Sequence, residues 1–249
     1  MSAPVLEVNG LQKRFAGIVA TNDLSLDVRA GETHALIGPN GAGKTTLIAQ
    51  LQGELTPDGG TILFNGRDIT REPAYRRAHL GIARSFQITS IFPQFTVLAN
   101  VALAVQAQQG HGFRFFRKAS DDPALTLPAR DAIDKIGLTD RADIYAEDLS
   151  HGERRQLELA MALAMRPSLL LLDEPMAGMG RQDGQRMTKI LQGLKKSYAI
   201  LIVEHDMDAV FALADRISVL VAGRTIASGT VDEIRSDPLV RAAYLGHGS

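Results

Sequence analysis

Residues 38–45 read GPNGAGKT and fit the phosphate-loop pattern G-x-x-x-x-G-K-[ST] without a mismatch. The glycines let the backbone curl so that its N–H groups point at phosphate oxygens. Lys44 can reach the β- and γ-phosphates of a nucleotide, and the hydroxyl of Thr45 can bind Mg²⁺. Because residues 34–37 predict a strand and residues 46–51 a helix, this segment predicts a nucleotide site rather than a chance match in a turn.

Acidic and polar residues follow other predicted strands. Asp173 and Glu174 come directly after four leucines; Asp173 can hold Mg²⁺ through water, and Glu174 can polarise an attacking water. His205 follows another strand, at the edge where open α/β sheets place ligands, and can contact a γ-phosphate and orient the water. The amide oxygen of Gln87 can complete the Mg²⁺ shell. Each of these residues alone also fits an ordinary strand-end or loop position, so their functional interpretation depends on the phosphate loop.

The elements that must position these residues alternate along the chain. Apolar and β-branched runs predict strands at 5–8, 19–28, 61–64, 81–86, 169–172, 199–203 and 217–220. Helical spacing of apolar residues occurs at 97–109, 125–136 and 153–165, with an aperiodic polar, aromatic and basic stretch at 111–123. Strands with little alternation suit a parallel sheet covered on both faces. The sequence therefore predicts an α/β core interrupted by a helical insertion from about residue 88 to 165.

Composition excludes several other classes of protein. The 249 residues, 45% of them apolar, suit one large domain or a domain with a subdomain. A net charge of −1 argues against a broad nucleic-acid footprint, and the lack of cysteine excludes disulfides and cysteine-ligated zinc. No apolar run approaches the ~18 residues of a membrane span, and residues 1–12 lack the features of a signal peptide. A soluble cytoplasmic protein is predicted.

These elements, in this order, resemble the ATP-binding cassette of ABC transporters over nearly the whole chain. Residues 149–153, LSHGE, look like that family's LSGGQ signature, placed just before a helix. The resemblance implies one ABC ATPase domain, 1–249. Its phosphate-loop NTPase core, 1–87 and 166–249, would hold a mostly parallel sheet and an N-terminal antiparallel β part. Its inserted α-helical subdomain, 88–165, would carry the signature.

The resemblance also implies ATP and Mg²⁺ as ligands and a head-to-tail dimer, with itself or a related ATPase subunit, that encloses two ATP molecules. Implied catalytic residues are Lys44, Glu174 and His205, and implied metal ligands are Thr45, Gln87 and Asp173. Implied ATP contacts from one subunit are Phe15, Asn40, Gly41, Ala42, Gly43, Lys44, Thr45, Thr46 and Gln87. Those from the other subunit are Ser150, Gly152 and Glu153.

Two of these implied contacts have a structural alternative. Ser150 and the N–H groups after it form a natural anion site, yet Ser150 also fits a helix N-cap with Glu153 at the capping-box position, and both can hold at once. Phe15 is expected to stack on adenine, with apolar contact from Val19 and Ala20. The alternative for Phe15 is packing in the strand layer.

The chain departs from the family pattern at a few positions. His151 replaces a signature glycine, Glu153 replaces the signature glutamine, and Gly180 stands where the family usually brings an Asp to the dimer interface. Residues 149–153, 204–207 and 240–246 look like those of importers of branched-chain and other hydrophobic amino acids, whose relatives handle urea or short amides. The cargo itself is not readable, because the ATPase does not touch it.

Residues 87–97 are similar to the Gln-loop of that subfamily, and membrane permease subunits are expected to make contact near residues 87–95. Ile91, Phe92, Pro93 and Phe95 are the candidate permease surface, with a contact between subdomain and sheet as the alternative. The basic aromatic stretch 112–118 suits a lipid or permease contact or, equally, a solvated loop. Contact with single-stranded nucleic acid is the weakest alternative, because the chain as a whole is nearly neutral. A substrate-binding protein is implied as an indirect partner, and nucleic acid is not expected.

The leading hypothesis is therefore an ATPase subunit that powers an importer, peripheral on the cytoplasmic face of the cell membrane. The alternative is a soluble ABC-type ATPase of DNA repair or translation, but such proteins usually carry a long coiled coil or two cassettes, which this sequence lacks. A third hypothesis, a nucleotide-binding module without turnover, is disfavoured by intact Glu174 and His205. Phosphate release and co-purification with a polytopic membrane protein distinguish the three.

Overall fold

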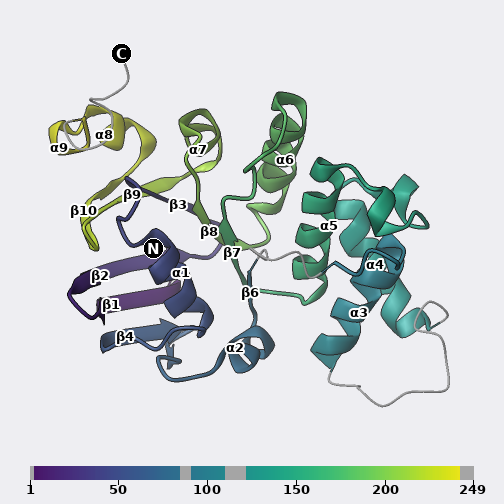
Figure 1. Ribbon diagram of the computed structural model, residues 1–249, viewed down its shortest axis with the longest axis horizontal. Helices are drawn as coiled ribbons and strands as arrows, with labels where there is room; N and C mark the ends of the chain where they lie inside the picture. The colour runs from purple at the N-terminus through teal and green to yellow at the C-terminus, as the bar shows by residue number, and fades with distance from the viewer. Residues whose placement is uncertain (1–2, 85–90, 110–121, 242–249) are drawn as a thin grey trace.

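The computed structural model describes residues 3–84, 91–109 and 122–241, which form two sheets flanked by helices (Figure 1). The four-stranded antiparallel sheet has the order β2-β1-β4-β5. Its strands are β1 (Pro4–Phe15), β2 (Ile18–Arg29), β4 (Gly59–Phe64) and β5 (Arg67–Asp68). The six-stranded sheet has the order β10-β9-β3-β8-β7-β6 and is parallel except for the pair β9 and β10. Its strands are β3 (Thr33–Ile37), β6 (Ile82–Arg84), β7 (Leu169–Asp173), β8 (Ala199–Val203), β9 (Arg216–Val221) and β10 (Arg224–Gly229).

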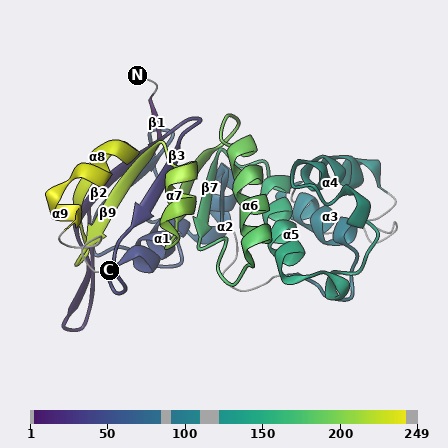
Figure 2. The ribbon, with the colours of Figure 1, turned by 90° about the horizontal axis from the view of Figure 1, so that it is seen from above.

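The helices fall into two groups. Three of them, α3 (Val97–Gln109), α4 (Pro123–Lys135) and α5 (His151–Ala164), pack against one another at the end of the molecule away from the antiparallel sheet (Figures 1 and 2). The others accompany the sheets: α1 (Lys44–Gln52), α2 (Ala74–Leu80), α6 (Arg181–Leu194), α7 (Met207–Leu213), α8 (Val231–Ser236) and α9 (Pro238–Val240). The predicted α/β fold with a parallel sheet, an antiparallel part and helices is confirmed.

The strand predictions differ from the structure at the edges of the sheets. β1 runs on to Phe15, well past the predicted 5–8, because the antiparallel hairpin with β2 continues to the pair Phe15 and Ile18. Within that extra length Leu11 is apolar and fully buried, but its neighbours from Asn9 to Arg14 are polar residues or glycine, so no apolar run extends the signal. The two-residue β5 is exposed and the edge strand β10 has no buried residue, so neither carries the buried apolar pattern by which strands were predicted.

The parallel strands place their carboxyl ends together, which positions the site. Every residue of β3 and β8 is buried, as expected for strands covered on both faces. Val203, the last residue of β8, pairs with Leu36 of β3 on one side and with Asp173 of β7 on the other. The phosphate loop after β3, the acids at the end of β7 and the histidine after β8 therefore lie at one edge.

A buried histidine links β3 to its neighbours. His34 is 1% exposed; its Nδ1 lies 2.8 Å from the carbonyl oxygen of Asp27, and its Nε2 lies 2.8 Å from the Ser218 hydroxyl. Burial and the charge of Arg216 lower the pKa of His34 to about 4, although Asp27 and Glu32 act in the opposite direction. The folded protein therefore keeps His34 neutral at pH values where an unfolded chain protonates it.

We expect this histidine to make the fold sensitive to mild acid. Between the ordinary histidine pKa of 6.5 and the folded value of about 4, the unfolded chain binds a proton that the folded chain excludes, so stability falls as the pH falls. The loss reaches about 3 kcal/mol at pH 4, since one pKa unit corresponds to about 1.4 kcal/mol. Urea unfolding at a series of pH values should show a shallower slope in this window for His34→Gln. Equal slopes in the two proteins would contradict the assignment.

Candidate nucleotide site

The phosphate loop lies between β3 and α1 and is pressed against β2. Gly43 caps the N-terminus of α1 with a φ of 104°, and a Cβ at this position would lie 2.2 Å from the carbonyl oxygen of Ala20. Only glycine permits this left-handed conformation and this close approach. The sequence therefore brings the hairpin of β1 and β2 next to the start of α1, where backbone N–H groups and the helix dipole favour an anion.

Lys44 is held inside the loop. Its side chain is nearly buried, and Nζ donates hydrogen bonds to the carbonyl oxygens of Gly38 at 2.7 Å and Pro39 at 3.0 Å. Burial lowers the pKa of Lys44, while the carboxylates of Glu174 and Asp173 counteract that effect. The ammonium group thus lies within the electrostatic reach of both acids.

One hollow of about 330 Å³ brings most of the predicted site together. It is lined by Phe15, Ile18, Ala20, Asn40, Gly41, Ala42, Gly43, Lys44, Thr45, Thr46, Glu174 and His205. Thus residues from the β1–β2 hairpin, the phosphate loop and the ends of β7 and β8 share a single cavity. The Phe15 ring is 46% exposed, so it is available for a stacked base rather than packed in the strand layer. Ile18 and Ala20 line this cavity in place of Val19, because successive side chains of a strand point to opposite faces.

The same cavity is lined by a carboxylate and an imidazole that are in direct contact. His205 Nε2 is hydrogen-bonded to Glu174 Oε1, and both side chains are about 40% exposed. Glu174 has a φ of 51°, and its N–H donates to Val203 O at 2.8 Å. A left-handed backbone at a residue other than glycine costs about 1–3 kcal/mol and often marks a functional position. Because the Glu174 side chain lines the same cavity as the phosphate loop and is partly exposed, its carboxylate is open to water there.

Asp173 has a different environment from its neighbour. Its side chain is 5% exposed and pairs with Arg84, whose Nη2 lies 3.0 Å from Asp173 Oδ2. Burial raises the pKa of Asp173, and Arg84 counteracts part of that shift. The two adjacent acids thus differ in environment: Asp173 is buried and paired with Arg84, and Glu174 is exposed beside His205.

The available oxygens fit a magnesium ion that nucleotide phosphates help to hold. In the part of the chain that the structure describes, no group of three or more His, Cys, Asp or Glu side chains could hold a metal ion alone. Mg²⁺ in nucleotide sites is usually held by one or two protein oxygens, water and substrate phosphates. The Thr45 hydroxyl and the Asp173 carboxylate are such hard ligands. The third predicted ligand, Gln87, lies outside the described residues.

Glu204 is a buried acid to which sequence reasoning assigned no role. It is 4% exposed and accepts hydrogen bonds from the N–H groups of Met176 at 2.9 Å and His205 at 3.1 Å. Burial raises the pKa of Glu204, and these backbone bonds counteract the shift. Glu204 therefore ties the segment after Glu174 to the segment that carries His205. An acid directly before the histidine was the only local signal.

The signature residues do not line the cavity. Ser150 caps α5 and accepts from Glu153 N at 3.2 Å, while Glu153 Oε2 accepts from Ser150 N at 2.9 Å. Glu153 also pairs with Arg141 at 2.9 Å, so its carboxylate is already engaged within the subunit. The capping-box interpretation is confirmed. Phosphate contact by Ser150, Gly152 and Glu153 stays a prediction that requires a second subunit.

The first residues of α5 face another segment of the same chain. A Cβ at Gly152 would lie 2.7 Å from the carboxylate of Asp183, so a larger residue at this position would require the Asp183 side chain to move. His151 Nε2 lies 3.4 Å from the carbonyl oxygen of Ala177. The start of α5 thus lies against the segment 177–183. Gly180, within this segment, is the N-cap residue of α6.

The apolar cluster predicted as a permease surface divides into two kinds of residue. Ile91 is partly buried against the core. Phe92 and Phe95 stack on each other with ring centroids 5.4 Å apart, and they are 51% and 43% exposed. The two phenylalanines are thus available to a partner, while Ile91 is largely a core contact. Residues 112–118 lie outside the described residues.

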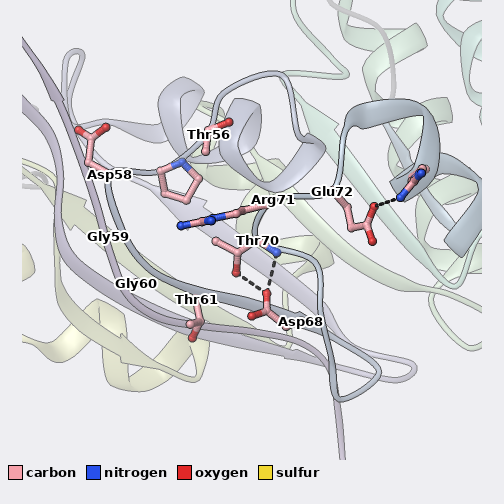
Figure 3. Close-up of a pocket in the computed structure, with 11 residues that line it drawn as sticks. Thr56, Asp58, Gly59, Gly60, Thr61, Asp68, Thr70, Arg71 and Glu72 are labelled. Carbon is pink, nitrogen blue, oxygen red and sulfur yellow. Dashed lines mark hydrogen bonds and ion pairs between the residues drawn. The ribbon is translucent and has the colours of Figure 1, made fainter.

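A larger hollow, of about 730 Å³, lies beside the antiparallel sheet (Figure 3). Its acids are already partnered: Asp68 accepts from the hydroxyl and N–H of Thr70, and Glu72 pairs with Arg67 and Arg76. None of the residues predicted to act on a nucleotide lines it. The smaller cavity is the functional candidate because of its chemistry, not its size.

The arrangement described above defines an ATP-binding cassette. A phosphate loop opens a helix, two acids follow one strand and a histidine follows the next. A separate group of helices carries a signature-like N-terminus. Two family models match: ABC transporter over residues 21–177, and branched-chain amino acid ATP-binding cassette transporter over residues 224–249. The chain therefore belongs to the ABC transporter family of ATP-binding cassettes, whose members bind nucleotide and couple ATP hydrolysis to transport.

Individual relatives agree with this assignment. The chain is 38% identical to the high-affinity branched-chain amino acid transport ATP-binding protein LivG of Salmonella typhimurium and 36% identical to BraF of Pseudomonas aeruginosa, over 99% of each chain. A crystal structure of the ADP conformation of an ABC transporter cassette has a TM-score of 0.87 and 28% identity, covering 99% of this chain and 100% of that one. Within the described ranges, no helix is long and apolar enough to cross a membrane.

Proposed function

We propose that this chain hydrolyses ATP to power the import of branched-chain or other hydrophobic amino acids. The observation that carries the ATPase part is the single cavity that joins Lys44 and Thr45 to Glu174 and His205. The cargo is supported by relatives whose names state branched-chain amino acid transport and which align over 99% of the chain. The soluble cassette of DNA repair or translation has no comparable support.

Hydrolysis follows from the groups around the cavity. The N-terminus of α1 and Lys44 bind the phosphates. Glu174 accepts a hydrogen bond from a water molecule and takes its proton as the oxygen attacks the γ-phosphorus. The bond between that phosphorus and the β-phosphate oxygen breaks, its electron pair stays with ADP, and inorganic phosphate is released. His205, which contacts Glu174, is proposed to bond a γ-phosphate oxygen.

Magnesium is the proposed metal cofactor, with Thr45, Asp173 and Gln87 as the residues that hold it directly or through water. When bound, Mg²⁺ neutralises charge that develops on the phosphate oxygens. Phe15 is proposed as the surface on which adenine stacks. Lys13 Nζ lies 5.7 Å from the centroid of the Phe15 ring, and the same ammonium group bonds to Asp58 at 2.8 Å. These contacts support the orientation of the ring.

A second ATPase subunit, either another copy or a related cassette, is proposed to complete the site. The exposed Ser150 and the first turn of α5 offer an anion site that the chain's own cavity does not use. The permease subunits are proposed to contact Phe92 and Phe95. The complex would sit peripherally on the cytoplasmic face of the membrane and receive cargo from a substrate-binding protein.

ATPase stimulation tests the cargo. The chain is co-expressed with candidate permease subunits encoded in the same genome, and the complex is reconstituted in liposomes with the matching binding protein. We expect leucine-loaded binding protein to raise ATP hydrolysis several-fold over the unloaded form. Glutamate serves as the control ligand. Failure of the permeases to co-purify would contradict the transport role, and stimulation by urea or an amide alone would contradict the amino-acid cargo.

A further inference from the structure

Arg84 joins three parts of the molecule at the buried end of β6. Its side chain is only 6% exposed, and Nη2 lies 3.0 Å from Asp173 Oδ2 at the end of β7. Nη1 lies 2.6 Å from Gln52 Oε1 and 3.1 Å from Glu54 Oε2. Gln52 is the last residue of α1, the helix that begins at Lys44. One guanidinium therefore connects the end of the phosphate-loop helix to the acid proposed as a magnesium ligand.

The chemistry of this contact favours a positioning function. A guanidinium presents a rigid planar set of donors. Because Arg84 is also bonded to Gln52 and Glu54, its bond to Asp173 Oδ2 holds that carboxylate oxygen in place. A carboxylate has about four acceptor sites, so the bond to Arg84 leaves others for a metal-bound water. Partners that hold a metal ligand from outside typically change metal affinity by 10–100-fold when they are removed.

We propose that Arg84 positions the Asp173 carboxylate for Mg²⁺ and links it to the C-terminal end of α1. Helix α1 and strand β7 would then present Thr45, near the start of α1, and Asp173, at the end of β7, to the same ion. This inference rests on the proposed magnesium site. It adds a residue that touches neither nucleotide nor metal, and whose effect should appear only when Mg²⁺ is present.

The test separates metal binding from nucleotide binding. ADP is titrated by calorimetry into the chain and into Arg84→Met, in Mg²⁺ and in EDTA, and the Mg²⁺ concentration that gives half of the thermal stabilisation at saturating ADP is measured. We expect that concentration to rise about tenfold or more in Arg84→Met. ADP affinity in EDTA should stay within about twofold of the parent, because no phosphate contact is lost.

Two further variants keep the result interpretable. Glu54→Gln removes the charge of an exposed partner of Arg84, since the Glu54 side chain is 52% exposed. The ion pair between Arg84 and Asp173 remains, so this variant should not change the Mg²⁺ requirement. Arg84→Lys keeps the charge but lacks the planar fork that reaches Asp173 and Gln52 together. We therefore expect a Mg²⁺ requirement between those of the parent and Arg84→Met. Arg84→Lys replaces Arg84→Met in the comparison if the methionine variant does not fold.

The possible outcomes point in different directions. If both Arg84 variants need the same Mg²⁺ concentration as the parent, the inference is overturned. If they need less Mg²⁺ than the parent, it is also overturned, because Arg84 then competes with the metal for Asp173. A parent protein that binds ADP equally well in Mg²⁺ and EDTA contradicts the proposed magnesium site itself. A parent that binds no ADP at all contradicts the nucleotide site. The failure of the Arg84 inference is thus distinguishable from the failure of the function on which it rests.

Discussion

Glu174→Gln is expected to bind ATP as tightly as the parent, within about twofold, and to lose nearly all turnover. A general base contributes roughly 10²–10⁴-fold to a rate, and glutamine cannot take a proton from water. The substitution keeps the shape of the side chain. No phosphate contact is assigned to this carboxylate, which lies in the cavity beside His205. Steady-state phosphate release and ATP titration in the same buffer measure the two quantities.

The control for this prediction is an acid of the same type outside the cavity. Glu72 pairs with Arg67 and Arg76 beside the antiparallel sheet, and Glu72→Gln should hydrolyse ATP at the parent rate. If Glu174→Gln retains the parent rate, Glu174 does not act on the attacking water. If Glu174→Gln instead fails to bind ATP, its carboxylate has a binding function that the proposed mechanism does not contain.

Local patterns in the sequence were sufficient to locate a helix, a strand or a motif wherever the signal lies within one continuous segment. The helices at 97–109, 125–136 and 153–165 were located to within two residues, because apolar spacing is a property of a single segment. The phosphate loop and the acid pair were found for the same reason. Their residues are adjacent in the chain, and each group sits at the end of a strand with an unmistakable apolar run.

Contacts between distant segments could not be predicted. Arg84 and Asp173 are 89 positions apart, and no pattern in either strand says that β6 lies beside β7. Glu204 is similar: its carboxylate bonds to Met176, 28 residues away, and only the packed structure shows that it is buried. The sequence thus indicated which groups are candidates for the chemistry. The residues that hold those groups in place emerged only from tertiary structure.

The proposed sharing of the site between two subunits predicts the second large effect, which is complementation between two inactive variants. Lys44→Met removes the cation at the phosphates, and Ser150→Arg places a bulky side chain at the signature. Each homodimer should lose about 10²-fold or more of its ATPase activity, because both of its sites lack an electrostatic contact to the phosphates or are blocked. In a mixed dimer with head-to-tail symmetry, both lesions meet at one site and the other site is intact.

Mixing equal amounts of the two variants should therefore restore about one quarter of the parent activity, since half of a random mixture is heterodimer and each heterodimer has one intact site. Lys44→Met mixed with Glu174→Gln is the matched control. Those two residues line the same cavity, so every site in that mixture stays damaged and no activity should return. If the Lys44 and Ser150 variants also fail to complement while the chain forms homodimers, the two residues do not meet across an interface between copies of this chain. A chain that forms no homodimer points instead to the related cassette that was proposed as the other possible partner.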